Sequence, residues 1–448
     1  MDFEQTISYL LGLGHETLTI KLGLENTETL LAALGNPQRQ FPAVQIAGTN
    51  GKGSTAAFLD SICRASGIRT GLFTSPHLVS ITERIKIGGE QISEDRFAHF
   101  TRIVSETAEE LVARGKLHKL PTFFEHITAI ALAAFRDANV ELAILETGLG
   151  GRLDSTTAAG AEIVAITPVA MDHQEYLGTT LREIAVEKAA IIRRGVTAIV
   201  APQNEAAFEV IIRQCESVGV RPRLIESPLG SLGRRACYRE QGLSEATADG
   251  RCIVTFDSDG TSYQNITLGL RGRHQSTNAL TAIALAEALR EHGFQIPDEA
   301  IVRGIETAHH PGRLEIWEVS PRFLFDGAHN PAAARALREY LDEFVKEPIV
   351  MIFGGMRDKA LKEMAAALFP RADIVILTSL DNPRAASIDA LVAAVPEDFD
   401  QGRILRAANV DKTLQLARTV TPANGLVCVT GSLHLVGAVQ RALRARET

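Results

Sequence analysis

The 448-residue sequence contains few aromatic side chains, few cysteines and no long hydrophobic run. Its five cysteines are dispersed without a Cys-x-x-Cys pair, so the spacings of common zinc sites and redox motifs are missing. A scattered, odd-numbered set of this kind is typical of reduced thiols in a cytoplasmic protein. No apolar run approaches the roughly 18 residues of a membrane span. The opening segment MDFEQTISYL also lacks the basic character of a signal peptide. We therefore expect a cytoplasmic protein without a membrane partner.

The sequence also lacks an excess of positive charge. Its formal net charge is −8, which argues against a broad electrostatic surface for nucleic acid. Hydrophobic residues make up 45% of the chain and charged residues 22%, a balance that favours a globular protein over a disordered one. A chain of this length divides into about two or three domains. Any affinity for phosphate must therefore be local.

A glycine-rich segment after a short apolar run is the feature around which the chain is organised. Residues 44–47 (VQIA) have the character of a buried strand, residues 48–54 read GTNGKGS, and a helix-compatible stretch follows. Glycines let backbone N–H groups converge on an anion, the helix N-terminus adds its positive dipole end, and Lys52 adds a full charge. Ser54 or Thr55 can offer a hydroxyl to a phosphate-bound Mg²⁺. This order predicts a phosphate-binding loop.

The loop departs from the standard P-loop pattern at two positions. Gly53 stands where Ser or Thr is expected, and Ile46 stands where the first glycine belongs. An ordinary glycine-rich turn between a strand and a helix is the alternative interpretation of this segment alone.

Predicted strands precede three polar side chains, Ser75, Glu146 and His173. Strands are predicted at 70–73, 142–145, 163–166 and 198–200, and helices at 94–114, 123–138, 182–194, 205–217 and 275–292. Such alternation predicts a mostly parallel sheet, with functional groups at the carboxyl ends of its strands. Oxygen ligands or His at a strand end can hold a divalent cation. The alternatives are a solvated glutamate, a structural histidine and a Ser-Pro turn.

The predicted pattern of secondary structure changes at two points along the chain. Short strands with turns over 220–272 predict a small antiparallel subsheet on the first domain. The segment 309–312 (HHPG) breaks the chain, and a second strand–helix alternation follows, with strands at 323–325, 349–353, 374–377 and 426–429. We therefore predict an α/β protein with a P-loop ATPase-type domain over 1–308 and a smaller Rossmann-like domain over 309–448.

Two further stretches contain residue types that suit ligand binding. Phe123 and Phe124 could stack on a flat heterocycle, and Glu125 could accept its N–H groups; two aromatics at the start of an apolar helix are also typical of core. Asp326 follows a predicted strand and precedes a glycine, where a carboxylate can meet a ribose. A turn in which Asn330 caps a helix is the alternative there.

Taken together, these stretches resemble motifs of the folylpolyglutamate synthase and dihydrofolate synthase family, within the Mur ligase superfamily. The resemblance runs in order from residue 44 to residue 437. The stretches that carry it are GTNGKGS (48–54), SPHL (75–78), PTFFEH (121–126), ETGLGGRLD (146–154), DH (172–173), EKAAI (187–191), RHQSTNA (273–279), PGR (311–313), DGAHNP (326–331), FGGMRDK (353–359) and TGSL (430–433).

The resemblance implies roles for individual residues. Ser75, Glu146 and His173 match residues that bind two Mg²⁺ ions beside the phosphates of ATP. Lys188 matches a lysine that is carbamylated, although a lysine is by default a surface residue. The residues that it implies for ATP are Asn50, Gly51, Lys52, Gly53, Ser54, Asn278, Arg313 and Asp326. Those implied for the pterin are Thr122, Phe124, Glu125 and Asp154, and those for glutamate are His329 and Ser432. The catalytic set is Lys52, Lys188 and His173.

The activity implied by the resemblance is an ATP-dependent ligase that joins L-glutamate to folates, and to dihydropteroate as well, through an acyl phosphate. The expected partners are small molecules only, and the expected state is a monomer. Two alternatives remain: a Mur-type ligase for peptidoglycan precursors, and a nucleotide-binding ATPase without ligase chemistry. The DGAHNP form and the glycine at position 53 disfavour the first, and the motifs of the second half disfavour the other.

Overall fold

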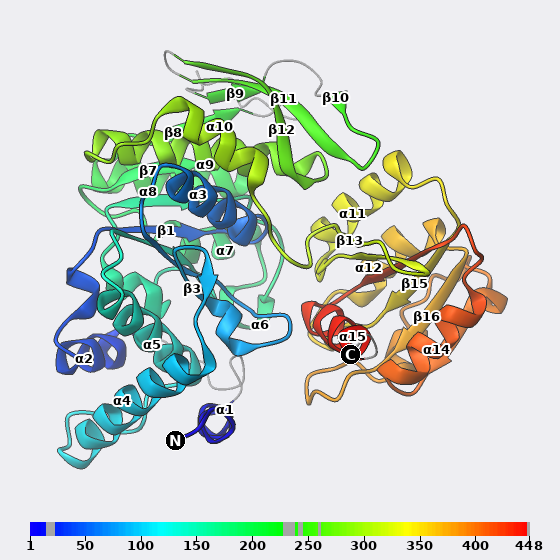
Figure 1. Cartoon of the computed structure of the whole chain (residues 1–448), viewed down its shortest axis with the longest axis horizontal. Helices are drawn as coiled ribbons and strands as arrows, with labels where there is room; N and C mark the ends of the chain where they lie inside the picture. The colour runs from blue at the N-terminus through cyan, green and yellow to red at the C-terminus, as the bar shows by residue number, and fades with distance from the viewer. Residues whose placement is uncertain (15–22, 227–237, 241–244, 259–260, 446–448) are drawn as a thin grey trace.

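The computed structural model describes residues 1–14, 23–226, 238–240, 245–258 and 261–445. Figure 1 shows two α/β bodies side by side, with the first two-thirds of the chain in the larger one and the yellow-to-red remainder in the smaller one. The predicted subsheet region over 220–272 lies partly outside the described residues.

The centre of the larger sheet is parallel, as predicted. Its six central strands lie in the order β8–β7–β6–β1–β5–β2. Their bounds are β1 Ala43–Ala47, β2 Thr70–Phe73, β5 Leu142–Glu146, β6 Ile163–Ile166, β7 Thr197–Val200 and β8 Arg223–Glu226. Because β1 lies between β5 and β6, the loop after β1 lies beside the loops that follow both of these strands.

Mostly antiparallel strands extend this sheet at both ends, so that the described residues contribute twelve strands to it. The far end confirms the predicted subsheet and consists of β9 Tyr238–Glu240, β10 Glu245–Ala246, β11 Arg251–Asp257 and β12 Ser262–Arg271. The near end is a hairpin of β3 Ile85–Ile87 and β4 Glu90–Gln91. The sequence did not predict this hairpin, because two or three residues are too few to show an alternating pattern.

Helices cover both faces of the larger sheet. They are α1 Phe3–Gly12, α2 Glu25–Ala33, α3 Lys52–Ala65, α4 Glu94–Ala113, α5 Phe123–Asp137, α6 Gln174–Leu177, α7 Leu181–Ala189, α8 Glu205–Val218, α9 His274–Glu291 and α10 Asp298–Thr307. Short 3₁₀ segments lie at Pro37–Arg39, Ile81–Arg84 and Ser155–Ala159. The helix predicted over 182–194 ends earlier, at Ala189, and the chain then turns toward β7.

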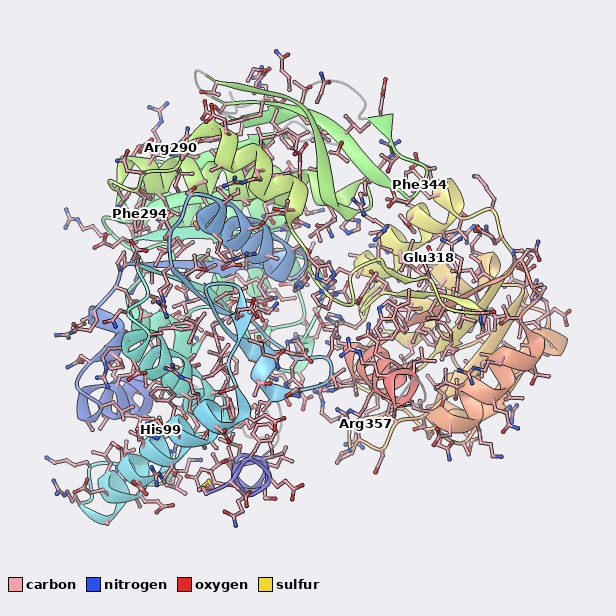
Figure 2. All side chains as sticks on the ribbon, in the orientation of Figure 1. His99, Arg290, Phe294, Glu318, Phe344 and Arg357 are labelled. Carbon is pink, nitrogen blue, oxygen red and sulfur yellow. The ribbon has the colours of Figure 1, made fainter. Side chains whose placement is uncertain are left out.

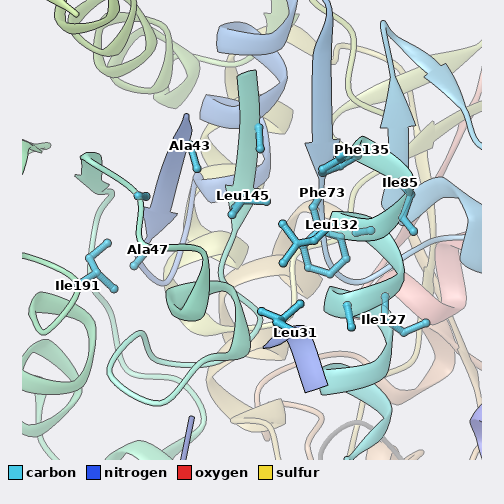
Figure 3. Close-up of a cluster of buried hydrophobic side chains, with 14 of the residues drawn as sticks. Leu31, Ala43, Ala47, Phe73, Ile85, Ile127, Leu132, Phe135, Leu145 and Ile191 are labelled. Carbon is cyan, nitrogen blue, oxygen red and sulfur yellow. The ribbon is translucent and has the colours of Figure 1, made fainter. Parts of the chain in front are cut away.

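Each central strand contributes side chains to two hydrophobic cores. Ala43 and Ala47 of β1 face the core that contains α5, whereas Val44 and Ile46 face the core that contains α3 and α9. Figure 3 shows the first of these cores, in which Leu145 and Phe135 lie among the labelled side chains. Burial on both faces explains why these strands are continuous apolar runs.

The smaller domain repeats this plan with six strands among the described residues, in the order β13–β14–β18–β15–β16–β17. The strands are β13 Glu315–Trp317, β14 Arg322–Phe325, β15 Ile349–Phe353, β16 Ile374–Thr378, β17 Ile404–Ala407 and β18 Leu426–Thr430. The helices are α11 Pro331–Phe344, α12 Leu361–Leu368, α13 Ile388–Val392, α14 Val410–Val420 and α15 Leu433–Arg444, with 3₁₀ segments at Phe369–Arg371 and Gln401–Arg403. Only β13 is antiparallel to its neighbour. The edge strands β13 and β17 were not predicted.

The chain passes from the larger sheet to the smaller one between Thr307, where α10 ends, and Glu315, where β13 begins. The boundary predicted at 308/309 lies in this interval, and the division of tasks between the two domains stays a prediction. In the part of the chain that the structure describes, no helix is both long and apolar enough to cross a membrane.

Polar contacts join the domains away from the linker. The Tyr340 hydroxyl of α11 donates to the Asp249 carbonyl at 3.0 Å, and Arg273 pairs with Glu343 at 2.6 Å. Phe344, labelled in Figure 2, extends from the end of α11 nearest the β10–β11 turn. A third contact joins Arg441 of α15 to the Val79 carbonyl at 2.6 Å.

Candidate active site

A cavity of about 730 Å³ lies where the two domains meet. Its lining includes, from both domains, every residue to which the family resemblance assigns a role: Asn50, Gly51, Lys52, Gly53, Ser54, Ser75, Thr122, Phe124, Glu125, Glu146, Asp154, His173, Lys188, Asn278, Arg313, Asp326, His329 and Ser432. A cavity of this size can hold molecules as large as a nucleotide and a substrate.

The glycine-rich loop connects β1 directly to the N-terminus of α3. Gly48 has φ +151° and Gly51 has φ +88°, conformations that L side chains rarely adopt. A Cβ at Gly51 would lie 2.3 Å from the Oδ1 atom of Asn278, so the loop backbone packs directly against α9. The N–H groups of Thr49 and Asn50 donate to the Pro168 carbonyl, which fixes the start of the loop. The later N–H groups at the start of α3 belong to the cavity-lining residues 52–54 and suit an anion.

The surroundings of Gly53 explain the departure from the P-loop pattern. A Cβ at this position would lie 2.8 Å from Nε2 of His310 and 3.3 Å from Oε2 of Glu146. A serine or threonine there would collide with these side chains. The missing side chain thus leaves space for Glu146 beside the phosphate loop. Ser54 lines the cavity, whereas Thr55 is fully buried away from it.

Two lysines contact main-chain carbonyls of the loop. The Nζ atom of Lys52 donates to the Thr49 carbonyl at 3.3 Å, and the Nζ atom of Lys188 donates to the Gly48 carbonyl at 2.8 Å. Lys188 is only 4% exposed, so the default expectation of a surface lysine is wrong. Burial, followed by the charge of Lys52, lowers the pKa of Lys188 to about 7. The amine therefore loses its proton near neutral pH.

Glu146 ends β5 and lines the cavity beside the loop. It is 5% exposed, and its Oε2 accepts the Ser75 N–H at 3.1 Å. Burial raises its pKa, while the charge of Lys52 acts in the opposite direction. A buried carboxylate held by one main-chain donor keeps lone pairs for a further ligand.

His173 has a ring nitrogen that lacks a protein partner. Its Nδ1 atom is buried without a hydrogen bond, and burial lowers the pKa of the side chain to about 3. A neutral imidazole with an unused nitrogen can bind a cation. Within the described residues, no three His, Cys, Asp or Glu side chains converge on one point. A metal held by Glu146 or His173 must therefore complete its shell with hydroxyl, phosphate or water oxygens, and Mg²⁺ accepts such mixed oxygen-rich sets.

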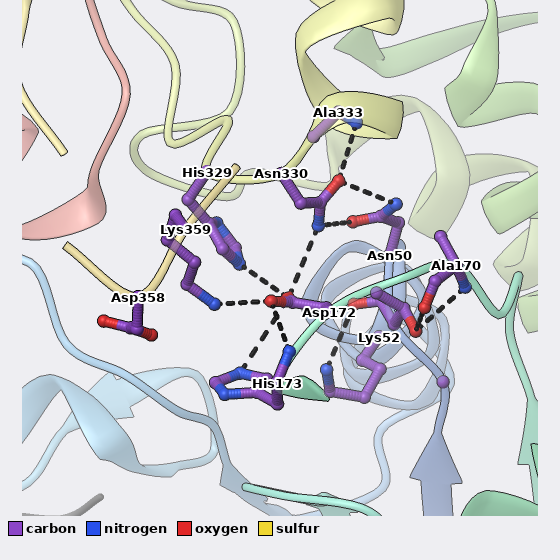
Figure 4. A network of polar contacts seen from close by, with 12 residues as sticks. Asn50, Lys52, Ala170, Asp172, His173, His329, Asn330, Ala333, Asp358 and Lys359 are labelled. Atoms are coloured by element: carbon purple, nitrogen blue, oxygen red, sulfur yellow. Dashed lines mark hydrogen bonds and ion pairs between the residues drawn. The ribbon is translucent and has the colours of Figure 1, made fainter. Parts of the chain in front are cut away.

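Asp172 connects the two domains. Its Oδ1 accepts from Nζ of Lys359 at 2.5 Å, and its Oδ2 lies 3.5 Å from Nε2 of His329 (Figure 4). Asn330 also reaches this carboxylate and exchanges amide contacts with Asn50 of the phosphate loop. Although burial acts to raise it, the hydrogen bond with His329 and the nearby positive charges hold the pKa of Asp172 well below its usual range.

The predicted pterin residues line the same cavity, from the start of α5 and from the loop after β5. Thr122 and Glu125 form a capping box at the start of α5, with the Thr122 N–H donating to Oε2 of Glu125 at 2.6 Å. Asp154 accepts the N–H groups of Gly148 and Leu149 and so closes its own loop. Burial raises the pKa of Asp154, and these hydrogen bonds oppose the rise.

The two adjacent phenylalanines have different environments. Phe123 is 5% exposed and belongs to the core, as the alternative interpretation expected. Phe124 lines the cavity and lies between Gly148, where a Cβ would be 2.4 Å from its ring, and Phe73, whose ring centroid is 5.8 Å away.

The second domain contributes residues from its strand ends and helix starts. Asp326 is buried and accepts the N–H groups of Leu314 and Ala328, which fixes the segment that carries Arg313. Burial raises the pKa of Asp326, and Arg313 acts against this rise. Ser432 caps α15 by accepting the His434 N–H at 3.2 Å.

Comparison with known proteins assigns the family. Residues 46–286 match the Mur ligase middle domain, and residues 312–433 match the glutamate ligase domain of Mur ligases. The chain is 32% identical to the dihydrofolate synthase/folylpolyglutamate synthase of Bacillus subtilis, over 95% of this chain and 96% of that protein. The chain belongs to the folylpolyglutamate synthase/dihydrofolate synthase family.

Solved structures of this family have the same two-domain fold. Folylpolyglutamate synthase of Mycobacterium tuberculosis complexed with ADP is 31% identical, with a TM-score of 0.90 over 98% of each chain. The structure of Escherichia coli FolC in complex with DHPP and ADP is 30% identical, with a TM-score of 0.86 over 100% of this chain and 99% of that one. The chain spans about half the length of two further relatives, the probable bifunctional folylpolyglutamate synthase/dihydropteroate synthases of Halobacterium salinarum and Haloferax volcanii, at 36% and 33% identity.

Sequence reasoning missed one side of the cavity in this family member. It is lined by apolar side chains from the ends of β7 and β8, from α8 and from α11, including Pro202, Phe208, Leu224, Ala332, Ala333 and Ala336. The alanines recur on one face of α11, which is a detectable signal for a close-packed surface. The side chains from the larger domain belong to no recognisable sequence motif, and they reach the cavity only because of the way the chain folds.

Proposed function

We propose that this chain is an ATP-dependent ligase that joins L-glutamate to reduced folates and to 7,8-dihydropteroate. The observation that carries the proposal is a single cavity in which the phosphate loop, the buried Glu146 and the cap of α15 meet an aromatic-lined end at Phe124. A nucleotide, an acid and an amine can therefore meet in one enclosed space. The name of the Bacillus subtilis relative also combines both activities.

The first step is phosphoryl transfer. A carboxylate oxygen of the folate or pteroate attacks the γ-phosphorus of ATP, the bond to the β–γ bridging oxygen breaks, and ADP leaves. Lys52 and the N–H groups at the start of α3 stabilise the negative charge on the transferring group, since positioning and charge stabilisation dominate such reactions. The product is an acyl phosphate.

Two Mg²⁺ ions are proposed beside the phosphates, with Ser75, Glu146 and His173 as protein ligands. The fit rests on the buried carboxylate of Glu146 and the unpartnered Nδ1 of His173. When bound, Mg²⁺ neutralises phosphate oxygens and orients them. Carbamylation of Lys188 is part of the same proposal, because an amine that loses its proton near pH 7 can add CO₂.

The second step forms the amide. The amine of L-glutamate attacks the acyl carbon, and phosphate leaves. His329 and Ser432 are proposed to bind the incoming glutamate, and Asn278, Arg313 and Asp326 to bind ATP across the domain junction. An acyl phosphate hydrolyses in water, so closure of the second domain over the cavity protects it.

We further propose that the protein acts as a monomer in the cytoplasm. The four described cysteines are all free and buried, which agrees with a reducing compartment. The only partners in this proposal are ATP, L-glutamate and the pterin substrates.

Product analysis tests the proposal. Purified protein is supplied with ATP, Mg²⁺ and L-glutamate, and with either 7,8-dihydropteroate or tetrahydrofolate. The expected result is ADP release with a one-glutamate mass gain in both reactions. A gain with tetrahydrofolate alone would restrict the activity to polyglutamylation. ADP without any amide product would instead indicate an ATPase, and no turnover would overturn the assignment.

A further inference from the structure

The carboxylate of Asp172 contacts cavity residues from both domains (Figure 4). Its side chain and that of Lys359 are each 7% exposed, and their 2.5 Å ion pair crosses between domains. Because the partners lie in different domains, the pair requires the domain arrangement seen here, and losing one partner would leave the other charge buried and unpaired.

Asp172 also fixes the loop on its own side of the junction. Its Oδ1 accepts the N–H of His173 at 2.9 Å, and His173 has the left-handed conformation, with φ +49°. A non-glycine residue is held in this region only by its surroundings. The orientation of the His173 imidazole therefore depends on the Asp172 side chain.

On the other side of the junction, Asp172 faces His329. The Nδ1 atom of His329 donates to the Gly327 carbonyl at 2.8 Å, which leaves Nε2 directed at Oδ2 of Asp172, 3.5 Å away. Asn330, next to His329, reaches the same oxygen at 3.5 Å. One carboxylate thus contacts both histidines and the lysine that locks the domains.

We propose that Asp172 is a positioning residue. It fixes the positions of the His173 and His329 side chains relative to each other while its ion pair with Lys359 holds the two domains together. This inference rests on the proposed function, in which His173 serves the phosphoryl step and His329 the glutamate step. Asp172 itself does not touch the reacting atoms. Through these contacts, His329 is placed to bind glutamate only when the two domains lie together as in this structure.

The variant Asp172→Asn tests this role, because asparagine has the same size and its Oδ1 can still accept the His173 N–H. It removes the charge that holds Lys359. We expect the KM for L-glutamate to rise and kcat to fall, each by at least about tenfold, since a charge-assisted contact is lost. The KM for ATP should change by less than about threefold, because Asp172 makes no contact with the phosphate loop except through Asn330.

A double-mutant cycle with Lys359→Met isolates the pair. Each single variant leaves a buried polar group without its charge partner, whereas the double variant removes both charges. The effects on kcat/KM for glutamate should therefore be clearly less than multiplicative. Independent, multiplicative effects would overturn the proposal.

Glu343→Gln is the matched control. Like Asp172→Asn, it replaces a carboxylate with the amide of the same size in an interdomain ion pair. The two side chains of this pair, Arg273 and Glu343, are about 40% exposed and do not line the cavity. We expect its KM for glutamate to stay within about twofold of the parent, as for other exposed pairs.

Two further measurements separate positioning from general destabilisation. Thermal unfolding reports stability, and small-angle scattering reports domain separation. A larger radius of gyration in Asp172→Asn, with the glutamate-specific rise in KM, supports the proposal. If KM for ATP and for glutamate rise together, or if only the unfolding temperature falls, the proposal is wrong. Absence of ligase activity in the parent protein would be a failure of the proposed function instead.

Discussion

Gly437 of α15 lies directly against the main chain of Leu78, so that a Cβ on Gly437 would be only 1.8 Å from the Leu78 carbonyl oxygen. Leu78 follows the Ser75–Pro76 segment of the larger domain and packs against the core of the smaller one. A glycine at this position therefore allows the two domains to approach closely beside the cavity.

The first prediction concerns this contact. Gly437→Ala should lower kcat by at least about tenfold, because a small displacement of positioning groups has large effects on rate. The unfolding temperature should change little, since each domain keeps its own core. Steady-state kinetics and thermal unfolding check both parts. Gly402→Ala, in an exposed 3₁₀ segment of the smaller domain, is a suitable control and should retain full activity.

The second prediction concerns the phosphate loop. Gly53→Ser would restore the standard P-loop residue, yet we expect it to lower activity by more than about tenfold, because its side chain would collide with His310 and Glu146. Combining Gly53→Ser with His310→Ala should recover part of the activity by making space. Full activity in Gly53→Ser alone would show that the loop can shift at no cost.

The third prediction concerns Glu146. Glu146→Ala should raise the Mg²⁺ concentration needed for half-maximal activity by at least roughly tenfold. Stability should be unchanged or higher, because the variant removes a carboxylate whose burial is unfavourable. A Mg²⁺ titration and a thermal melt measure these effects. A large fall in the unfolding temperature would instead indicate a structural role for this carboxylate.

The fourth prediction concerns Lys188 and pH. Its pKa falls from 10.5 to about 7 in the folded protein, so the neutral amine becomes the main form as pH rises through 7. Uptake of ¹³CO₂, followed as a carbamate signal by NMR, should therefore increase between pH 6 and pH 8. Lys188→Met should show no such signal.

The same shift has a consequence for stability, with a defined sign. Between about pH 7 and pH 10.5 the unfolded chain binds a proton at Lys188 that the folded chain does not. This group therefore makes the free energy of unfolding increase with pH in that window, and below about pH 7, where both states carry the proton, it adds no further pH dependence. Denaturant titrations of the parent and Lys188→Met should differ in this slope. Identical slopes would contradict the lowered pKa.

The central strands and the residues at their carboxyl ends could be predicted from sequence for a physical reason. Strands buried on both faces are continuous apolar runs, and in a parallel sheet the ends of such runs lie at one edge. The strand pattern alone therefore places Glu146 and His173 near Lys52. In the second domain the strand pattern indicated only Asp326, and family resemblance added the other residues.

Features that depend on docking or burial could not be predicted in this way. Asp172 and Lys359 are 187 residues apart, and nothing in either local segment specifies the other. The burial of Lys188 depends on how α7 packs under the phosphate loop, and composition gives the opposite expectation. The strands β3 and β13 have too few residues to show a period, and β17 is not a continuous apolar run because the exposed Arg406 interrupts it.

Helix α11 has a role beyond packing, because both of its ends contact the larger domain. Asn330 at its start touches Asn50, and Tyr340 near its end touches Asp249, so the helix, about 21 Å long, bridges the junction. A motion that breaks the Asp172 contacts but keeps the Tyr340 contact must be a rotation about the far end of α11. Such a rotation would move the start of α11 most, so the cavity-lining alanines near that end, Ala332, Ala333 and Ala336, would move together with Asn330 and widen the cavity on that side.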